Sequence, residues 1–186
     1  MRTRMISSVL RNRTGAAAIE FAIMMPIFLL IVVGVTDLGG MLFTHYQLEQ
    51  AVAAGAEYAA VNASSVNSTS GGTLASSIAT LIENANGNGW ANDDVVINNG
   101  PSVSVTNGSA SSSGTASNAD NCYCPSGSPP NWSWGSSATC GSTCAAGNNS
   151  GKFVTITATA TYTPLLTAFN LVQTTTLRQS VVVEAQ

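Results

Sequence analysis

The sequence has little charge and almost no basic side chain beyond its first 15 positions. Charged residues make up 8% of the 186 residues, against roughly 25% in an ordinary soluble domain. After residue 15 the basic side chains are Lys152 and Arg178, which stand against nine acids. A nucleic-acid-binding protein needs a basic patch, so the sequence argues against nucleic acid as a partner.

The sequence also lacks the groups from which catalytic and cofactor sites are commonly built. His45 is its only histidine, and no acid or nucleophile is identifiable that would work with it. We interpret His45 as a member of a helical face. The sequence therefore predicts a protein that is not an enzyme, with no catalytic residue, no cofactor, no metal and no small-molecule substrate.

Charge is missing altogether between residues 21 and 36. Residues 17–36 form an apolar run in which Glu20 is the one ionisable side chain. As a helix this run is about 30 Å long, which matches the hydrocarbon core of a membrane. Pro26 removes one helical hydrogen bond, and membrane-spanning helices tolerate this. The sequence therefore predicts one membrane-spanning helix.

The basic residues predict the orientation of that helix. Four arginines precede the apolar run, and no Lys or Arg follows it before Lys152. This bias places the N-terminus in the cytoplasm and the bulk of the chain outside it. A cleaved secretory signal peptide is the alternative, but its apolar core would be shorter and small residues would follow at a cleavage site.

The helical pattern continues beyond the apolar run. No proline occurs between residues 37 and 62, and we expect one helix from about residue 17 to residue 61, roughly 65 Å long. One stripe recurs at helical spacing, so it packs either on the chain's own outer domain or on neighbouring subunits. Its members are Met41, His45, Leu48, Val52, Gly55 and Ala59.

Residues 62–186 predict a small α+β domain, with a few antiparallel strands laid against the long helix. A polar linker (residues 62–73) leads to a short amphipathic helix at residues 74–85. The clearest strand is "FVTITATATY", residues 153–162, in which Thr alternates with less polar residues and forms the wetter face. The other expected elements are strands at residues 95–97, 103–105 and 174–183 and a helical crossover at residues 165–171.

Residues 106–151 have too few aliphatic side chains for a core, so without a constraint they would form a disordered loop. All four cysteines lie in this segment, and the predicted topology puts them in an oxidising space where disulfides persist. Neighbours in Cys-Tyr-Cys rarely bridge each other. We therefore expect Cys122 and Cys124 each to pair with Cys140 or Cys144. Trp132 and Trp134 would pack over these bridges.

A zinc site is the alternative use of these cysteines. The usual zinc spacing, with two to four residues between ligands, is met by Cys140 and Cys144 but not by Cys122 and Cys124. A catalytic dithiol is disfavoured as well, because the sequence has no Cys-x-x-Cys motif. Disulfides are the reading that the spacing favours.

The stretch "GAAAIEFAIMMPIFLLIVVGVTDLGGMLFTHYQLEQAVAAGAEYAA", which begins at Gly15, resembles the TadE-like pseudopilin family of tight-adherence (Flp-type) pilus systems. The resemblance rests on small residues before Glu20 and Phe21, on Pro26 five residues later, and on Gly34. The segment "VTITATATYTPLL" and the strand after it are similar to that family's outer domain. One departure is that Ala54 and Glu57 stand where the family usually places Arg.

The resemblance implies a pilin-like leader and a processing site. A prepilin peptidase would cut after Gly15 and leave Ala16 as the new N-terminus, so that Glu20 becomes the fifth residue of the mature chain. In pilin-like assemblies the corresponding glutamate meets a neighbouring subunit's N-terminal amine, and Glu20 with Phe21 would then serve assembly. The alternative is that Glu20 only reaches the lipid headgroups.

These expectations divide the chain into a basic leader (residues 1–15), a transmembrane and extended helix (16–61) and an extracytoplasmic domain (62–186). The implied partners are the bacterial inner membrane, a prepilin peptidase, other pilin-like subunits and pilus assembly proteins. The alternative function is an uncleaved single-pass envelope protein with a disulfide-bonded outer binding domain.

Overall fold

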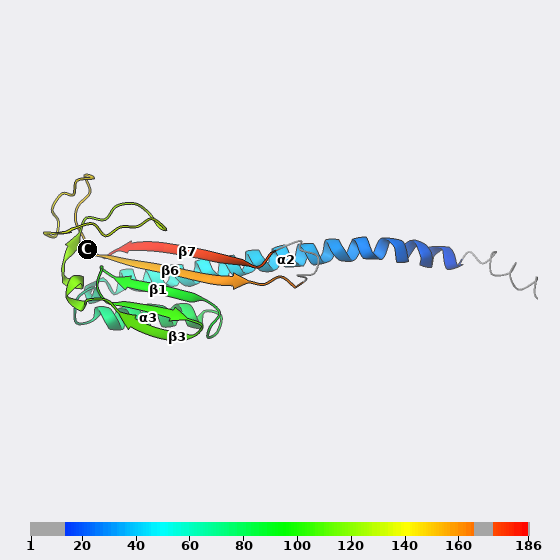
Figure 1. The fold of residues 1–186 in the computed structure, drawn as a ribbon, viewed down its shortest axis with the longest axis horizontal. Coiled ribbons are helices and arrows are strands. Elements are labelled where there is room, and N and C mark those ends of the chain that lie inside the picture. Colours follow the sequence, from blue (N-terminus) through cyan, green and yellow to red (C-terminus); the bar gives the residue numbers. More distant parts are fainter. Residues whose placement is uncertain (1–13, 166–172, 186) are drawn as a thin grey trace, which may run out of the picture. The chain divides into compact units, whose positions relative to one another are not determined.

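The structure, a computed structural model, describes residues 14–165 and 173–185. The chain divides into two compact units, residues 1–41 with 164–173 and residues 42–163 with 174–186. The predicted leader and the predicted crossover lie almost wholly outside the described residues. The elements, labelled in Figure 1 where there is room, are α2 (Thr14–Val61), η1 (Ala63–Ser65), α3 (Gly71–Asn84), β1 (Asn92–Ile97), β2 (Ser102–Thr106), β3 (Ser109–Ser113), η2 (Ala116–Asp120), β4 (Cys122–Tyr123), β5 (Ser137–Ala138), β6 (Phe153–Tyr162) and β7 (Thr175–Glu184).

Helix α2 belongs to both units. It is continuous from Thr14 to Val61 and contains Pro26, as expected for a helix whose apolar half tolerates proline. The prediction of one long helix is confirmed. Only its second part, residues 42–61, lies in the unit that contains the sheet.

The sheet has five strands in the order β3-β2-β1-β6-β7, and every neighbouring pair is antiparallel. This confirms the predicted α+β class. Strand β6 lies between β1 and β7, and its burial alternates as the sequence predicts: Ile156, Ala158 and Ala160 are buried, whereas the threonines between them are only half-buried. The buried side faces the helices.

Strand β3 corrects the sequence prediction, which assigned residues 106–151 to a loop. All five residues of β3 are exposed, and they are Ser and Ala, which have little strand preference. The strand forms because Asn107 and Gly108 have φ of 50° and 75°, which suits the tight turn of a hairpin. This turn folds β3 back onto β2 without any buried apolar side chain of β3 to drive it.

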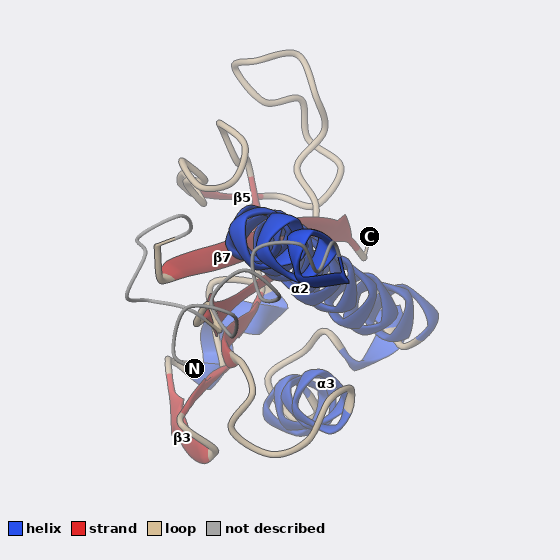
Figure 2. Cartoon of the chain, turned by 90° about the vertical axis from the view of Figure 1, so that its right-hand side faces the viewer, coloured by secondary structure: helices blue, strands red, loops and turns tan. Residues whose placement is uncertain are grey.

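The core lies between the inner face of the sheet, helix α3 and the second part of α2, which Figure 2 shows nearly end-on. Gly55 of α2 lets the elements approach closely. A Cβ at Gly55 would lie 3.1 Å from Ile78 Cγ2 of α3 and 3.4 Å from Ile156 Cδ1 of β6. The buried apolar residues that α2 contributes to this core are Leu48, Ala51, Val52 and Ala59.

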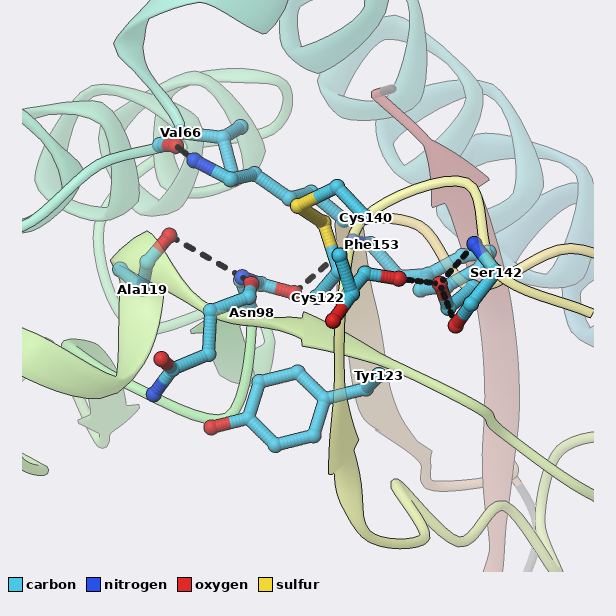
Figure 3. The surroundings of a disulfide bond; sticks show 12 residues. Val66, Asn98, Ala119, Cys122, Tyr123, Cys140, Ser142 and Phe153 are labelled. Atoms are coloured by element: carbon cyan, nitrogen blue, oxygen red, sulfur yellow. Dashed lines mark hydrogen bonds between the residues drawn. A yellow bond between two sulfur atoms is a disulfide. The ribbon is translucent and has the colours of Figure 1, made fainter. Parts of the chain in front are cut away.

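Asn98 connects the sheet to the cysteine-rich segment. It lies in the β1–β2 turn with a φ of 50° and is fully buried. Its Nδ2 donates to the carbonyls of Ala119 (3.0 Å) and Asn121 (2.6 Å), and its Oδ1 accepts from the Phe153 amide (3.2 Å). One side chain thus fixes both ends of the disulfide loop against the turn (Figure 3).

The cysteine-rich segment is held by two disulfides, Cys122–Cys140 and Cys124–Cys144. The predicted disulfides are confirmed, and the zinc alternative is wrong because a sulfur in a disulfide is no thiolate ligand. Trp132 and Trp134 lie edge to face with each other at 5.8 Å between ring centroids. Trp134 also meets Tyr123 and Trp132 meets Phe153, at 6.0 and 5.7 Å. The loop therefore has a small aromatic cluster in place of an aliphatic core.

Candidate membrane and assembly site

The first part of α2 is mostly apolar, and most of its residues between 17 and 36 are exposed. It is the one helix among the described residues that is long and apolar enough to cross a membrane, and none of its most apolar window is buried. Large side chains such as Phe21, Met24 and Val35 are each about two-thirds exposed. A soluble protein rarely exposes so continuous an apolar surface, so this surface requires a partner such as lipid or other helices.

The predicted processing and assembly residues lie at the start of this helix. Gly15, Glu20 and Phe21 are all in α2 and exposed, and a Cβ at Gly15 would have no neighbour within 4 Å. The side chain of Ala16 lies outside what the structure describes. The helix places these residues within two turns of one another, because each residue rises about 1.5 Å. No other part of the described chain surrounds them.

Asp37 follows the apolar run and differs from Glu20 in its surroundings. It is 1% exposed, and its Oδ1 accepts a hydrogen bond of 2.9 Å from the Leu165 amide. Both residues belong to the same compact unit. Asp37 thereby fixes the chain that leaves β6 to the helix at a separation of 128 residues, a contact that the sequence did not predict.

The second part of α2 has two different faces. The predicted stripe is confirmed as the face that packs on the chain's own domain, with Leu48, Val52, Gly55 and Ala59 buried and Met41 and His45 half-buried. His45 Nε2 lies 3.0 Å from Gln179 Nε2 of β7. The opposite flank exposes large apolar side chains, namely Leu42, Phe43, Tyr46 and Val61.

The sheet also contains a buried acid, Asp93 of β1. Strand alternation turns Asp93 to the inner face, where it is 4% exposed and both carboxylate oxygens lack a hydrogen-bond partner. Burial, with smaller contributions from the charges of Glu83 and Asp94, raises the pKa of Asp93 to about 7. Burial also raises the pKa of Asp94 on the outer face.

Asp120 shows the opposite behaviour at the start of the disulfide loop. Its Oδ1 accepts a hydrogen bond of 2.8 Å from the Ser68 amide. A hydrogen bond from the Ser68 side chain and, after it, the bond from the Ser68 amide lower the pKa of Asp120, with a smaller contribution from the charge of Lys152. Lys152 Nζ donates to the Val66 carbonyl at 3.0 Å, so these residues join the start of the domain to the cysteine-rich segment.

Sequence reasoning missed the structural roles of Asp37, Asp93 and Asn98. Only Asp93 left a trace in the sequence, because an acid two positions before Val95 breaks the inner-face alternation of β1. The partners of Asp37 and Asn98 are distant in the chain and belong to segments without a periodic pattern. No local pattern could have identified these two residues.

The fold and the site define a class: an α+β protein built on one long N-terminal helix, whose first part is an exposed apolar segment and whose second part belongs to the core of a disulfide-bonded domain. Residues 15–57 match the family described as TadE-like protein, which confirms the resemblance predicted from the sequence. The match associates the chain in general terms with the tight-adherence pilus machinery. No curated protein and no solved structure matches the chain significantly.

Proposed function

We propose that the protein is a minor pseudopilin or assembly component of a tight-adherence pilus, with a structural and not an enzymatic role. The proposal rests on two findings that concern the same helix, α2. The TadE-like match covers residues 15–57, and the apolar helix that is long enough to cross a membrane begins at Ala17, within that match. Lipid would cover this surface before assembly, and neighbouring pilin-like helices would cover it afterwards.

The proposed orientation puts the basic leader (residues 1–15) in the cytoplasm and residues 62–186 outside the inner membrane. The arginine bias supports this orientation, and two disulfides suit an oxidising compartment. In this arrangement a prepilin peptidase removes the leader after Gly15. Glu20 then lies near the new N-terminus at Ala16, at a membrane depth where an unpaired carboxylate is costly.

Mass spectrometry of the N-terminus tests the processing step. In cells with an active prepilin peptidase we expect the mature chain to begin at Ala16, and Gly15→Lys to leave the leader attached. Asn12→Lys adds the same charge to the leader and is the matched control that should still be processed. A wild-type chain that begins at Met1 in such cells contradicts the proposal and favours the uncleaved envelope protein.

Glu20→Ala tests the assembly step. We expect the variant to insert and to be processed normally but to lose incorporation or piliation, because the neighbouring amine loses its counter-charge. Glu57→Ala is the control, since Glu57 is an exposed acid on the same helix within the outer domain. Normal piliation with Glu20→Ala would mean that Glu20 only reaches the lipid headgroups.

A further inference from the structure

A cleft lies between α3 and strands β2 and β3. It has a volume of about 350 Å³, and its lining includes the apolar side chains of Val105 and Ala110. Oxygen-bearing side chains also belong to the lining: Ser76, Thr80, Glu83, Asn84, Asn88 and Ser112. The cleft therefore has room for an ion with several waters, each of which occupies about 30 Å³.

Two acidic side chains lie near the α3 C-terminal end of this cleft. Glu83 lines the cleft, and Asp93, which is outside its lining, is the cross-strand partner of the lining residue Val105 and is close enough to Glu83 for the two charges to interact. Glu83 Oε1 and both carboxylate oxygens of Asp93 are buried without a hydrogen-bond partner. A buried carboxyl group is either paired, hydrogen-bonded or bound to a metal as the carboxylate, or it is neutralised by a proton.

The remaining charges of the described chain do not neutralise this pair. Lys152 binds the Val66 carbonyl. Arg178 precedes Gln179, whose side chain contacts His45 on the inner side of the sheet, so alternation turns Arg178 to the outer side. Glu83 also lies in the last turn of α3, which has no basic residue, and the partial negative charge of a helix C-terminus disfavours an acid there.

We propose that Glu83 and Asp93 bind a hard divalent cation of the calcium class at this end of the cleft, with neutral oxygens from the cleft lining as further ligands. Among the described residues no group of three or more His, Cys, Asp or Glu converges. The site therefore offers two carboxylates and otherwise amide, hydroxyl or water oxygens. Calcium accepts such irregular oxygen shells, whereas magnesium demands near-octahedral geometry and zinc prefers nitrogen and sulfur.

The first experiment measures thermal unfolding of the full chain in detergent, after chelation, with CaCl₂ added against NaCl of equal ionic strength. With millimolar calcium we expect Tm to rise by about 2–8 °C, because calcium sites of modest charge bind at about 0.1–1 mM. Asp93→Asn and Glu83→Gln should abolish the rise. Asp94→Asn, which changes the neighbouring acid on the outer face, should keep it.

Wild-type protein that shows no calcium-dependent rise overturns the proposal and leaves the sequence prediction of no metal site standing. An equal rise in wild type and Asp93→Asn also overturns it, since the cation then acts elsewhere. The second measurement does not depend on the buried variant folding. Terbium substitutes for calcium, and Trp90, whose Nε1 donates to the Ile82 carbonyl at 2.8 Å, is close enough to sensitise its emission.

We expect Glu83→Gln to reduce the terbium emission at least tenfold at a subsaturating concentration, and added calcium to displace the terbium. The half-exposed Glu83 is a site where this change leaves the core intact. Emission that Glu83→Gln leaves unchanged overturns the proposal. Neither measurement depends on pilus assembly, so a negative result for the cation site says nothing against the proposed function, and the reverse also holds.

Discussion

The two parts of helix α2 differ in their surroundings, although both are rich in apolar and small side chains. Residues 17–36 are mostly exposed, and none of the most apolar window of this helix is buried, whereas residues 48–59 contribute four buried side chains to the core. The first part is apolar around its whole circumference, and the second is apolar mainly along one stripe. A continuous apolar surface indicates lipid or other helices, and a stripe indicates one covering face.

Leu48→Ala, in the second part of α2, should lower the free energy of unfolding more than any other substitution considered below. Leu48 is fully buried, and the substitution leaves a cavity that lowers the free energy of unfolding by about 2–5 kcal/mol. Leu38→Ala, on the first part at 52% exposure, should change it by less than about 0.5 kcal/mol. Denaturant unfolding in detergent, followed by tryptophan fluorescence, measures both. Equal losses would mean that the two parts pack alike.

Gly55→Leu adds side-chain volume to the second part of α2, where the helix packs on the core. Ile78 and Ile156 already lie in contact with the space that a side chain at Gly55 would enter, so we expect a loss of about 1–3 kcal/mol from overpacking. Gly34→Leu is the matched variant, because nothing lies within 4 Å of a Cβ there. Thermal unfolding of the domain should show a lower Tm for the first and an unchanged Tm for the second.

The pH dependence of stability distinguishes the buried Asp93 from its neighbour Asp94 on the outer face of the sheet. The folded pKa of Asp93, about 7, exceeds the ordinary value of 3.8, so the folded state binds this proton more tightly. The contribution is complete below about pH 4 and is lost as pH rises towards about 7. In calcium-free buffer we expect Tm to fall between about pH 5 and pH 8.

The control for this pH effect is Asp94→Asn, which should leave most of the fall in Tm in place. Asp93→Asn should remove most of it. The depressed pKa of Asp120 gives the opposite dependence only below about pH 4, outside this window. A Tm that rises with pH in wild-type protein would contradict the assignment of Asp93.

Asp37→Ala should have the smallest and most local effect. It deprives the Leu165 amide of its acceptor. Because Leu165 is largely exposed, water can replace part of this bond, so we expect a local cost of about 0.5–1.5 kcal/mol and an unchanged sheet. Hydrogen exchange followed by mass spectrometry should show faster exchange around Leu165. Unchanged exchange there would mean that Asp37 does not hold this segment.

The sequence was most informative where the spacing of apolar side chains matched the geometry of a helix or a strand. The apolar run predicted one long helix, the Thr alternation predicted β6, and the stripe from Met41 to Ala59 predicted the packing face of α2. It failed at β3, which has no apolar pattern and follows from the Asn107–Gly108 turn and the open edge of β2. The cysteine spacing limited the disulfides to two pairings, and the fold selected one.

The sequence by itself determined the apolar helix that is long enough to cross a membrane, the class of the outer domain and the family resemblance, because composition and local periodicity are properties of neighbouring residues. Only the tertiary structure decided which acids are buried, which asparagine holds the disulfide loop and how the cysteines pair. Those outcomes depend on residues that are distant in the chain, such as Asp37 with Leu165 and Asn98 with Phe153. No local pattern records which distant segment will supply the donor, the acceptor or the neighbouring charge.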